Sequence, residues 1–345
     1  MFVGHGLLAF ALVAAVATRL DYPRRRALAF GLVAGAFATV PDVDIAYALV
    51  GVVGAEATAP LQLAQSFWAT GNVVHRGVTH SLAVAPAAAA VAGLSAARRG
   101  ASGRRRVALS LGAGAVALAL VAGVTAVSGG LAGGVTAAFV LAVGVVATVA
   151  AAVGPSAREV VALALTGLLT HPFGDLFTGE PPAMLYPFDA TLFAARVTLH
   201  PDPTLHLLAA FALELSTAWL AVAVVARLYG VRPAVGWWAF GRRADGTTVL
   251  PRASLAAGYA ASVLLIPAPT LDLSYPFVFS VLAVGALGVI PRIRLVRSVG
   301  RRAGSPTVAL PSAATATLTG LTAVSVAAAA YTLAYVWVSV GGVGL

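Results

Sequence analysis

Histidine and aspartate side chains that can bind a metal ion occur in four short motifs of an otherwise apolar sequence. The motifs are His5, Pro41-Asp42-Val43-Asp44, His75-Arg76-Gly77-Val78-Thr79-His80-Ser81 and His171-Pro172-Phe173-Gly174-Asp175. Imidazole nitrogen and carboxylate oxygen are common ligands of zinc, and a catalytic zinc keeps one position for water. The chain has no cysteine, so thiolate ligands and disulfides are excluded. These residues therefore predict a His/Asp metal site, provided that the fold brings them together.

The composition is that of an integral membrane protein. Hydrophobic residues make up 60% of the 345 residues and charged residues 10%, and the mean hydropathy is +0.93. A soluble domain has about 25% charged residues. The net charge of +10 comes from arginines in short blocks between apolar runs, which is a topology signal and not a nucleic-acid-binding patch. We expect no nucleic-acid partner.

The apolar runs predict an all-α polytopic bundle of about ten transmembrane helices, because each span needs about 20 apolar residues. The expected helices cover residues 2–20, 27–40, 81–97, 107–127, 135–153, 160–170, 205–225, 253–268, 277–290 and 313–339. Residues 45–74 are expected to form an external segment with an interfacial helix, and residues 178–203 a second external loop. We expect residues 1–230 to form the metal-dependent region and residues 231–345 a C-terminal transmembrane extension.

The positive-inside rule places Arg24, Arg25 and Arg26 in the cytoplasm, so both termini are expected outside a multi-pass plasma-membrane protein. On this topology all four motifs reach the extracytoplasmic face, although they belong to helices of opposite direction. His171 and Asp175 share a helix face if the helix continues. A helix often ends before proline, however, and Pro172 leaves that geometry open.

Each motif also has a structural interpretation. His5 alone is typical of an interfacial histidine, Pro41 and Asp42 of a helix boundary, and Thr79 or Ser81 of a helix cap. Arg76 could bind a phosphate or simply extend to the membrane interface. In the second external loop, His200 and His206 flank a proline-rich turn that favours a structural role. An ionisable group costs about 2.5–3.5 kcal/mol at the centre of a membrane helix, which favours a shared functional site for the four motifs.

The order of these motifs resembles the YdjM-type family of membrane-bound metal-dependent hydrolases. The resemblance covers about the first 190 residues and includes Gly179 and Tyr186-Pro187-Phe188. The family is in turn similar to zinc-dependent phospholipase C and P1-type nuclease, which implies hydrolysis of a phosphodiester or phospholipid. It implies one or two divalent ions, zinc first and manganese as the alternative, with Asp175 as a bridging ligand.

We therefore predict a metal-dependent hydrolase that acts on a lipid or small phosphoester at the outer membrane interface. The expected ligands are His5, Asp42, His75, His80, His171 and Asp175, with Asp44 as a base or orienting group and Arg76 neutralising charge. One alternative is an ion- or proton-coupled transporter that uses the same residues. The other is a protein whose metal only stabilises the bundle. The motifs for a zinc protease and a serine hydrolase, H-E-x-x-H and G-x-S-x-G, are missing.

Overall fold

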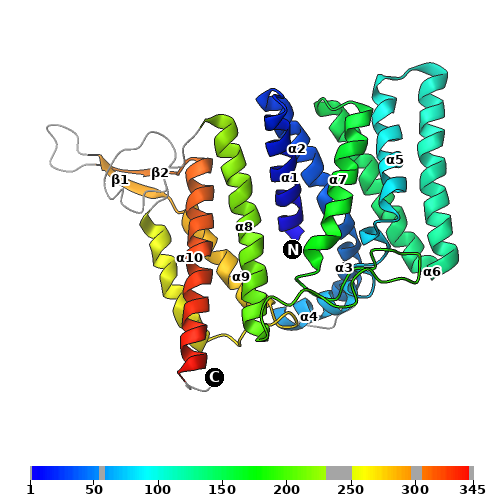
Figure 1. Cartoon of the computed structure of the whole chain (residues 1–345). Helices are drawn as coiled ribbons and strands as arrows, with labels where there is room; N and C mark the ends of the chain where they lie inside the picture. Colours follow the sequence, from blue (N-terminus) through cyan, green and yellow to red (C-terminus); the bar gives the residue numbers. More distant parts are fainter. Residues whose placement is uncertain (1, 54–58, 231–250, 297–304, 342–345) are drawn as a thin grey trace. The chain divides into compact units, whose positions relative to one another are not determined.

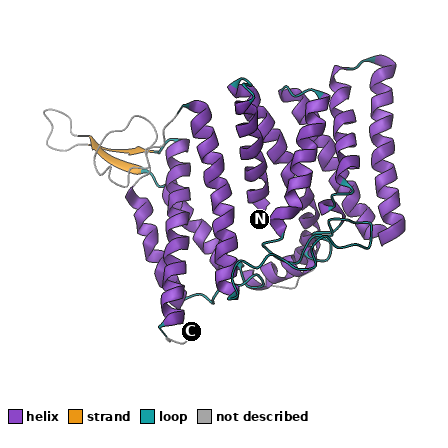
Figure 2. Ribbon diagram, viewed as in Figure 1, coloured by secondary structure: helices purple, strands orange, loops and turns teal. Residues whose placement is uncertain are grey.

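A computed structural model describes residues 2–53, 59–230, 251–296 and 305–341 (Figure 1). These residues are mainly helical (Figure 2). The exception is a short hairpin of β1 (Arg292–Val296) and β2 (Ser305–Ala309), which pair antiparallel with Arg292 opposite Ala309. The predicted all-α class is thus confirmed apart from this hairpin. The chain divides into two compact units, of which one comprises Met1–Thr198 with Leu213–Tyr229 and the other Leu199–Ala212 with Gly230–Leu345.

The first unit contains every predicted site residue. Its α-helices are α1 (Phe2–Arg19), α2 (Arg24–Thr39), α3 (Ala48–Val53), α4 (Pro60–Gly71), α5 (Ala85–Ala97), α6 (Gly103–Val153), α7 (Ala157–Asp175) and the later part of α8 (Pro203–Tyr229). Short 3-10 helices are η1 (Pro41–Tyr47), η2 (Val78–His80) and η3 (Arg98–Gly100). Residues 45–74, where one interfacial helix was predicted, contain α3 and α4, and their placement at a membrane interface stays a prediction.

The second unit contains η4 (Pro251–Leu264), α9 (Tyr275–Val284), η5 (Gly285–Gly288), the β-hairpin and α10 (Ala313–Val340). In its aromatic core, the ring centroid of Phe277 lies 5.0 Å from that of Tyr331 and 5.5 Å from that of Phe211. The predicted division between a metal-dependent region and an extension stays a prediction.

Three described helices, α6, α8 and α10, are long and apolar enough to cross a bilayer. A fourth span results if α2 and the segment Pro41–Val53, which meet at a 42° bend, are counted as one. The helical segments Val3–Arg19 and Tyr275–Gly288 are apolar but shorter. The predicted count of about ten spans is therefore not confirmed.

Helix α6 is two helices that meet at Gly129. The backbone of Gly129 has φ 84° and ψ 176°, a conformation that glycine adopts far more readily than other residues. Beyond the turn the two halves pack closely, since a Cβ on Gly133 would lie 2.0 Å from Thr125 Oγ1. The sequence predicted two helices here, joined by the glycine-rich segment 128–134, and the turn is shorter than that segment.

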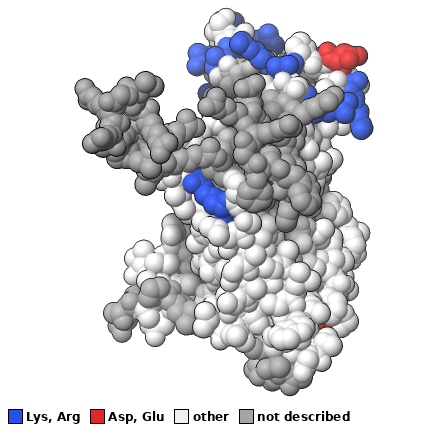
Figure 3. All heavy atoms as spheres, turned by 90° about the vertical axis from the view of Figure 1, so that its left-hand side faces the viewer, with Lys and Arg blue, Asp and Glu red and all other residues white. Residues whose placement is uncertain are grey.

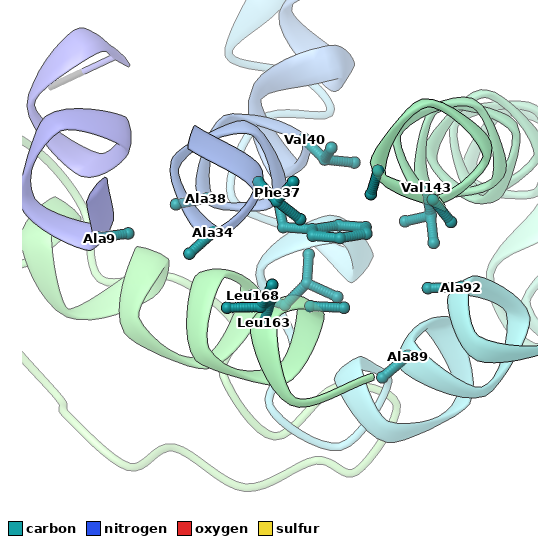
Figure 4. Packing of buried hydrophobic residues seen from close by; sticks show 14 of the residues in the cluster. Ala9, Ala34, Phe37, Ala38, Val40, Ala89, Ala92, Val143, Leu163 and Leu168 are labelled. Atoms are coloured by element: carbon teal, nitrogen blue, oxygen red, sulfur yellow. The ribbon is translucent and has the colours of Figure 1, made fainter. Parts of the chain in front are cut away.

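Small residues let the helices of the first unit pack with their backbones close together, which is typical of membrane bundles. Figure 4 shows Phe37 pointing from α2 into the space bounded by Leu163 and Leu168 of α7, Val143 of α6 and Ala92 of α5. A Cβ on Gly167 would lie 2.6 Å from Ala38 N. This close crossing fixes α7 against the end of α2, where the polar motifs begin.

Four helices carry or adjoin the motifs, and each has an arginine-bearing end and a polar-motif end. Arg19 ends α1, Arg24 begins α2, Arg98 follows α5 and Arg158 lies in the first turn of α7. At the arginine end, Arg26 donates to Glu159 Oε1 at 2.6 Å, and Glu159 also forms a capping box with Ser156. On the face shown in Figure 3, arginines gather mainly at one end.

Candidate metal centre

The motif ends of four segments bring the predicted residues into one buried cluster. His5 comes from the first turn of α1, Asp42 and Asp44 from η1, His75 to His80 from the turn that includes η2, and His171 and Asp175 from the end of α7. Helix α7 continues through Pro172, so His171 and Asp175 lie on one face with His171 Nε2 3.6 Å from Asp175 Oδ2. The structure thus joins residues up to 170 positions apart in sequence.

Hydrogen bonds assign the tautomers of the two central histidines. His171 Nδ1 lies 2.6 Å from the Ala38 carbonyl oxygen, which can only accept, so Nδ1 carries the proton. The Thr79 hydroxyl donates to Asp44 Oδ2 at 2.6 Å and therefore accepts from His80 Nδ1 at 2.8 Å. Both histidines consequently present an unprotonated Nε2. Burial also lowers the pKa of His80 below its ordinary value, which favours the neutral ring.

The two Nε2 atoms face each other among carboxylate oxygens. They are 3.0 Å apart, and Asp175 Oδ2 lies 3.0 Å from His80 Nε2. Asp42 Oδ1 lies 3.5 Å from His171 Nε2 and 3.9 Å from His80 Nε2. Asp42 Oδ2 and Asp175 Oδ2 are buried without a hydrogen-bond partner. Buried acceptors that face one another are unfavourable unless a proton or a cation lies between them, and a divalent cation among them would satisfy all four side chains.

Among the residues that the structure describes, three sets of side chains have ligand atoms close enough to hold a metal ion. They are His5 with His171 and Asp175, Asp42 with His80 and His171, and Asp44 with His75 and His80. The second set uses the two unprotonated Nε2 atoms. The third set would need the nitrogen of His80 that bonds to Thr79, and it is therefore less suited to a metal.

His5 extends the cluster on the side of α1. Its Nε2 lies 3.1 Å from Asp175 Oδ1, and its ring centroid is 4.0 Å from that of His171. The ring packs directly on Gly174, where an added Cβ would lie 2.4 Å from His5 Cε1. Gly174 therefore leaves the room that His5 needs beside Asp175.

We expect Gly174→Ala to lower metal affinity about 10-fold, because the new methyl group displaces His5 from Asp175 and ligand-supporting contacts are typically worth 10–100-fold. Titration with a competing chelator measures the affinity. Gly144→Ala is the matched control, since its Cβ would meet only Ser95 Oγ, at 3.9 Å. An unchanged affinity in Gly174→Ala would show that His5 does not support the metal.

Asp44 connects His75 with His80. Asp44 Oδ1 lies 2.9 Å from His75 Nδ1, and Asp44 Oδ2 accepts from the Thr79 hydroxyl. Asp44 is 2% exposed, and both of its oxygens are occupied by these contacts. Its position is that of a carboxylate that orients imidazole rings.

Removing the Thr79 hydroxyl tests this connection. In Thr79→Val the bonds from Asp44 to Thr79 and from Thr79 to His80 are both lost, so we expect metal affinity to fall about 10–100-fold. Thr79→Ser keeps the hydroxyl and should retain affinity close to that of the wild type. Equal affinities in the two variants, measured by chelator competition, would contradict the assigned tautomer of His80.

Arg76 links the cluster to the following loop. Its Nη1 donates to the Glu180 carbonyl at 2.7 Å, its Nη2 donates to Thr178 Oγ1 at 3.0 Å, and Nη2 is 3.7 Å from Asp175 Oδ1. Arg76 adopts φ 67°, which is uncommon outside glycine. A Cβ on Gly179 would lie 2.3 Å from Nη1. The guanidinium therefore holds the loop against Asp175, and its buried Nε has no hydrogen-bond partner.

Sequence reasoning missed two contributors besides Gly174. Thr79 was expected only as a helix cap. Ser81 is the residue that accepts from backbone N–H groups before α5, those of Ala83 and Val84. Thr79 instead bonds to Asp44 and His80 in the cluster. Glu214 accepts from Gly4 N at 3.2 Å, next to His5. A carboxylate within the apolar helix α8 was the signal that could have found it, since such groups are costly in a membrane.

The proline-rich turn around His200 is held by hydrogen bonds within the turn and by one from Tyr335 of α10 to Asp202 Oδ2 at 3.1 Å, and the structural role expected for it stays a prediction. His200 Nδ1 accepts from Asp202 N, and His206 Nδ1 accepts from Leu199 N. Asp202 in turn accepts from Leu205 N at 2.8 Å.

A family model for the YdjM inner membrane protein matches residues 1–240. The chain belongs to the YdjM family. This match confirms the expected family and extends beyond the 190 residues that the motifs covered. As a member of an inner-membrane family with long apolar helices, this YdjM-family chain is a membrane protein. No curated protein and no solved structure matched the chain, and the similarity to phospholipase C and P1-type nuclease stays an expectation.

Proposed function

We propose that this YdjM-family protein is a membrane-bound, metal-dependent hydrolase of a phosphoester or lipid. The observation that carries the proposal is the pair of unprotonated Nε2 atoms of His80 and His171, 3.0 Å apart and surrounded by Asp42 and Asp175. Imidazole with carboxylate suits zinc, and manganese is the alternative.

The four central side chains would hold the ion. A zinc ion in such a site would polarise a phosphoryl oxygen and activate a bound water. The residues around it have separate tasks: Thr79 and Ala38 fix the two central imidazoles, and Arg76 places a positive charge beside Asp175. A divalent cation with an adjacent guanidinium would favour an anionic substrate.

His75 is proposed here as the proton acceptor in place of a metal ligand. Asp44 accepts from its Nδ1–H, so Nε2 is the nitrogen that can take a proton. An imidazole oriented by a carboxylate is a common general base. Asp44 then acts as a positioning residue for both His75 and His80.

The proposed topology has several spans with the cluster and both termini on the extracytoplasmic side of the plasma membrane. It is supported by the arginine-bearing ends of α1, α2, α5 and α7, which lie at the opposite ends of these helices from the cluster. The turn at Gly129 supports two crossings within α6.

Hydrolysis of bis(p-nitrophenyl) phosphate by the detergent-purified protein tests the proposal. We expect turnover that disappears after chelation and returns when zinc or manganese is restored. Absence of turnover on this diester and on phospholipid, with metal bound, would overturn the proposal.

A second function is favoured by one observation. The bend between α2 and Pro41–Val53 places Asp42 and Asp44 at a helix break, and broken helices form the ion sites of many transporters. Cation-dependent uptake into proteoliposomes that is lost in Asp42→Asn would establish an ion-coupled transporter.

A further inference from the structure

An apolar groove of about 460 Å³ runs between α1 and α2 and ends at the cluster. It is lined by residues between Val3 and Phe10 of α1, residues between Leu32 and Thr39 of α2, and Asp42. Along it the helix backbones touch, since a Cβ on Gly35 would lie 2.7 Å from Gly6 O. Its volume lies within the 300–1,000 Å³ of typical ligand pockets.

One end of the groove is polar and the rest is hydrocarbon. The Thr39 hydroxyl is satisfied by the Ala36 carbonyl at 2.9 Å. Asp42 is the one ionisable residue on the described lining, and its buried Oδ2 has no hydrogen-bond partner. Because Asp42 Oδ1 also faces His171 Nε2, the groove leads from apolar helix surface directly to the proposed metal ligands.

The size of the groove limits what can occupy it. Eight consecutive residues of each helix span about 12 Å, at about 1.5 Å per residue. A packed helix is about 10 Å across, so one from a second copy could only lie over the groove, whereas a single hydrocarbon chain is thin enough to lie within it. The groove is also open to lipid, since Val3 and Leu32 are each 64% exposed.

We propose that the α1–α2 groove binds one hydrocarbon chain of a lipid with a phosphoryl headgroup, and that this headgroup lies at Asp42 and the histidine cluster. The assignment rests on the proposed hydrolase function and specifies its substrate class as a lipid that enters sideways from the bilayer. The headgroup is anionic because the cluster would present a divalent cation and the Arg76 guanidinium, which is 3.7 Å from Asp175 Oδ1.

Photolabelling in phosphatidylcholine nanodiscs tests this site without relying on turnover. The probe is phosphatidic acid with a diazirine in one palmitoyl chain, and labelled peptides are identified by mass spectrometry. Ala36→Phe fills the groove. Ala29→Phe is the matched control because it adds the same side chain seven residues earlier on α2, on nearly the same face but outside the groove.

We expect labelling of the α1 and α2 peptides to saturate, and to fall at least about 5-fold with excess unlabelled phosphatidic acid but not with diacylglycerol. Ala36→Phe should lose this competable labelling and Ala29→Phe should keep it. Labelling at the exposed Leu118 of α6 should rise linearly and resist competition, as for bulk lipid.

Linear, uncompeted labelling of the groove would overturn the proposal, as would competable labelling that survives in Ala36→Phe. Equal displacement by diacylglycerol would overturn the phosphoryl headgroup. If Ala36→Phe does not fold, Leu32→Ala removes an exposed wall of the groove and should weaken competition several-fold. Competable labelling without any hydrolysis would keep the lipid site and reject the hydrolase.

Discussion

His80→Ala and His171→Ala should each abolish stoichiometric metal binding. Each substitution removes one of the two Nε2 atoms that face each other at 3.0 Å. Loss of a group that merely supports a ligand costs about 10–100-fold in affinity, so loss of a ligand itself should cost more than about 100-fold. Elemental mass spectrometry of detergent-purified protein gives the metal content per chain.

His200→Ala is the matched control for these variants. His200 contacts Asp202 N in a local turn and belongs to none of the three candidate metal sets, so its metal content should equal that of the wild type. Metal that remains in both His80→Ala and His171→Ala would remove the basis of the proposed centre. Metal lost equally in His200→Ala would show that folding, and not ligation, controls the result.

The sequence was informative about the cluster because its signals were local and its background was apolar. Histidine and aspartate are conspicuous among alanine, valine and leucine, and arginine blocks indicated helix direction. These two features were enough to expect His5, Asp42, His80 and Asp175 near one another. Whether each of them binds metal remains a prediction.

The details that the sequence could not predict depend on three-dimensional packing. Helix α7 continues through Pro172, and nothing near that residue in sequence indicates that His171 will bond to Ala38 on another helix. The role of Thr79 depends on Asp44, 35 residues away. The number of spans was also poorly determined, because helices such as α1 and the segment Tyr275–Gly288 are apolar but short.

Arg76 shows how the same residue can satisfy both a structural and a functional interpretation. Its guanidinium was expected either at the membrane interface or beside a bound phosphate. In the structure it donates to Glu180 O and Thr178 Oγ1 and lies 3.7 Å from Asp175 Oδ1. It therefore brings charge to the cluster by holding a loop, a role that requires the absence of a side chain at Gly179.

His75→Gly should separate turnover from metal binding. In the proposed mechanism His75 accepts a proton while Asp44 holds its Nδ1–H, and general bases typically contribute about 10²–10⁴-fold to the rate. We therefore expect kcat on bis(p-nitrophenyl) phosphate to fall by about that factor, with the metal content of the wild type. Added imidazole should restore part of the lost rate, which a purely structural defect would not allow. Loss of metal together with activity would instead make His75 a ligand, as the sequence first suggested, and would place a second ion between Asp44 and His75.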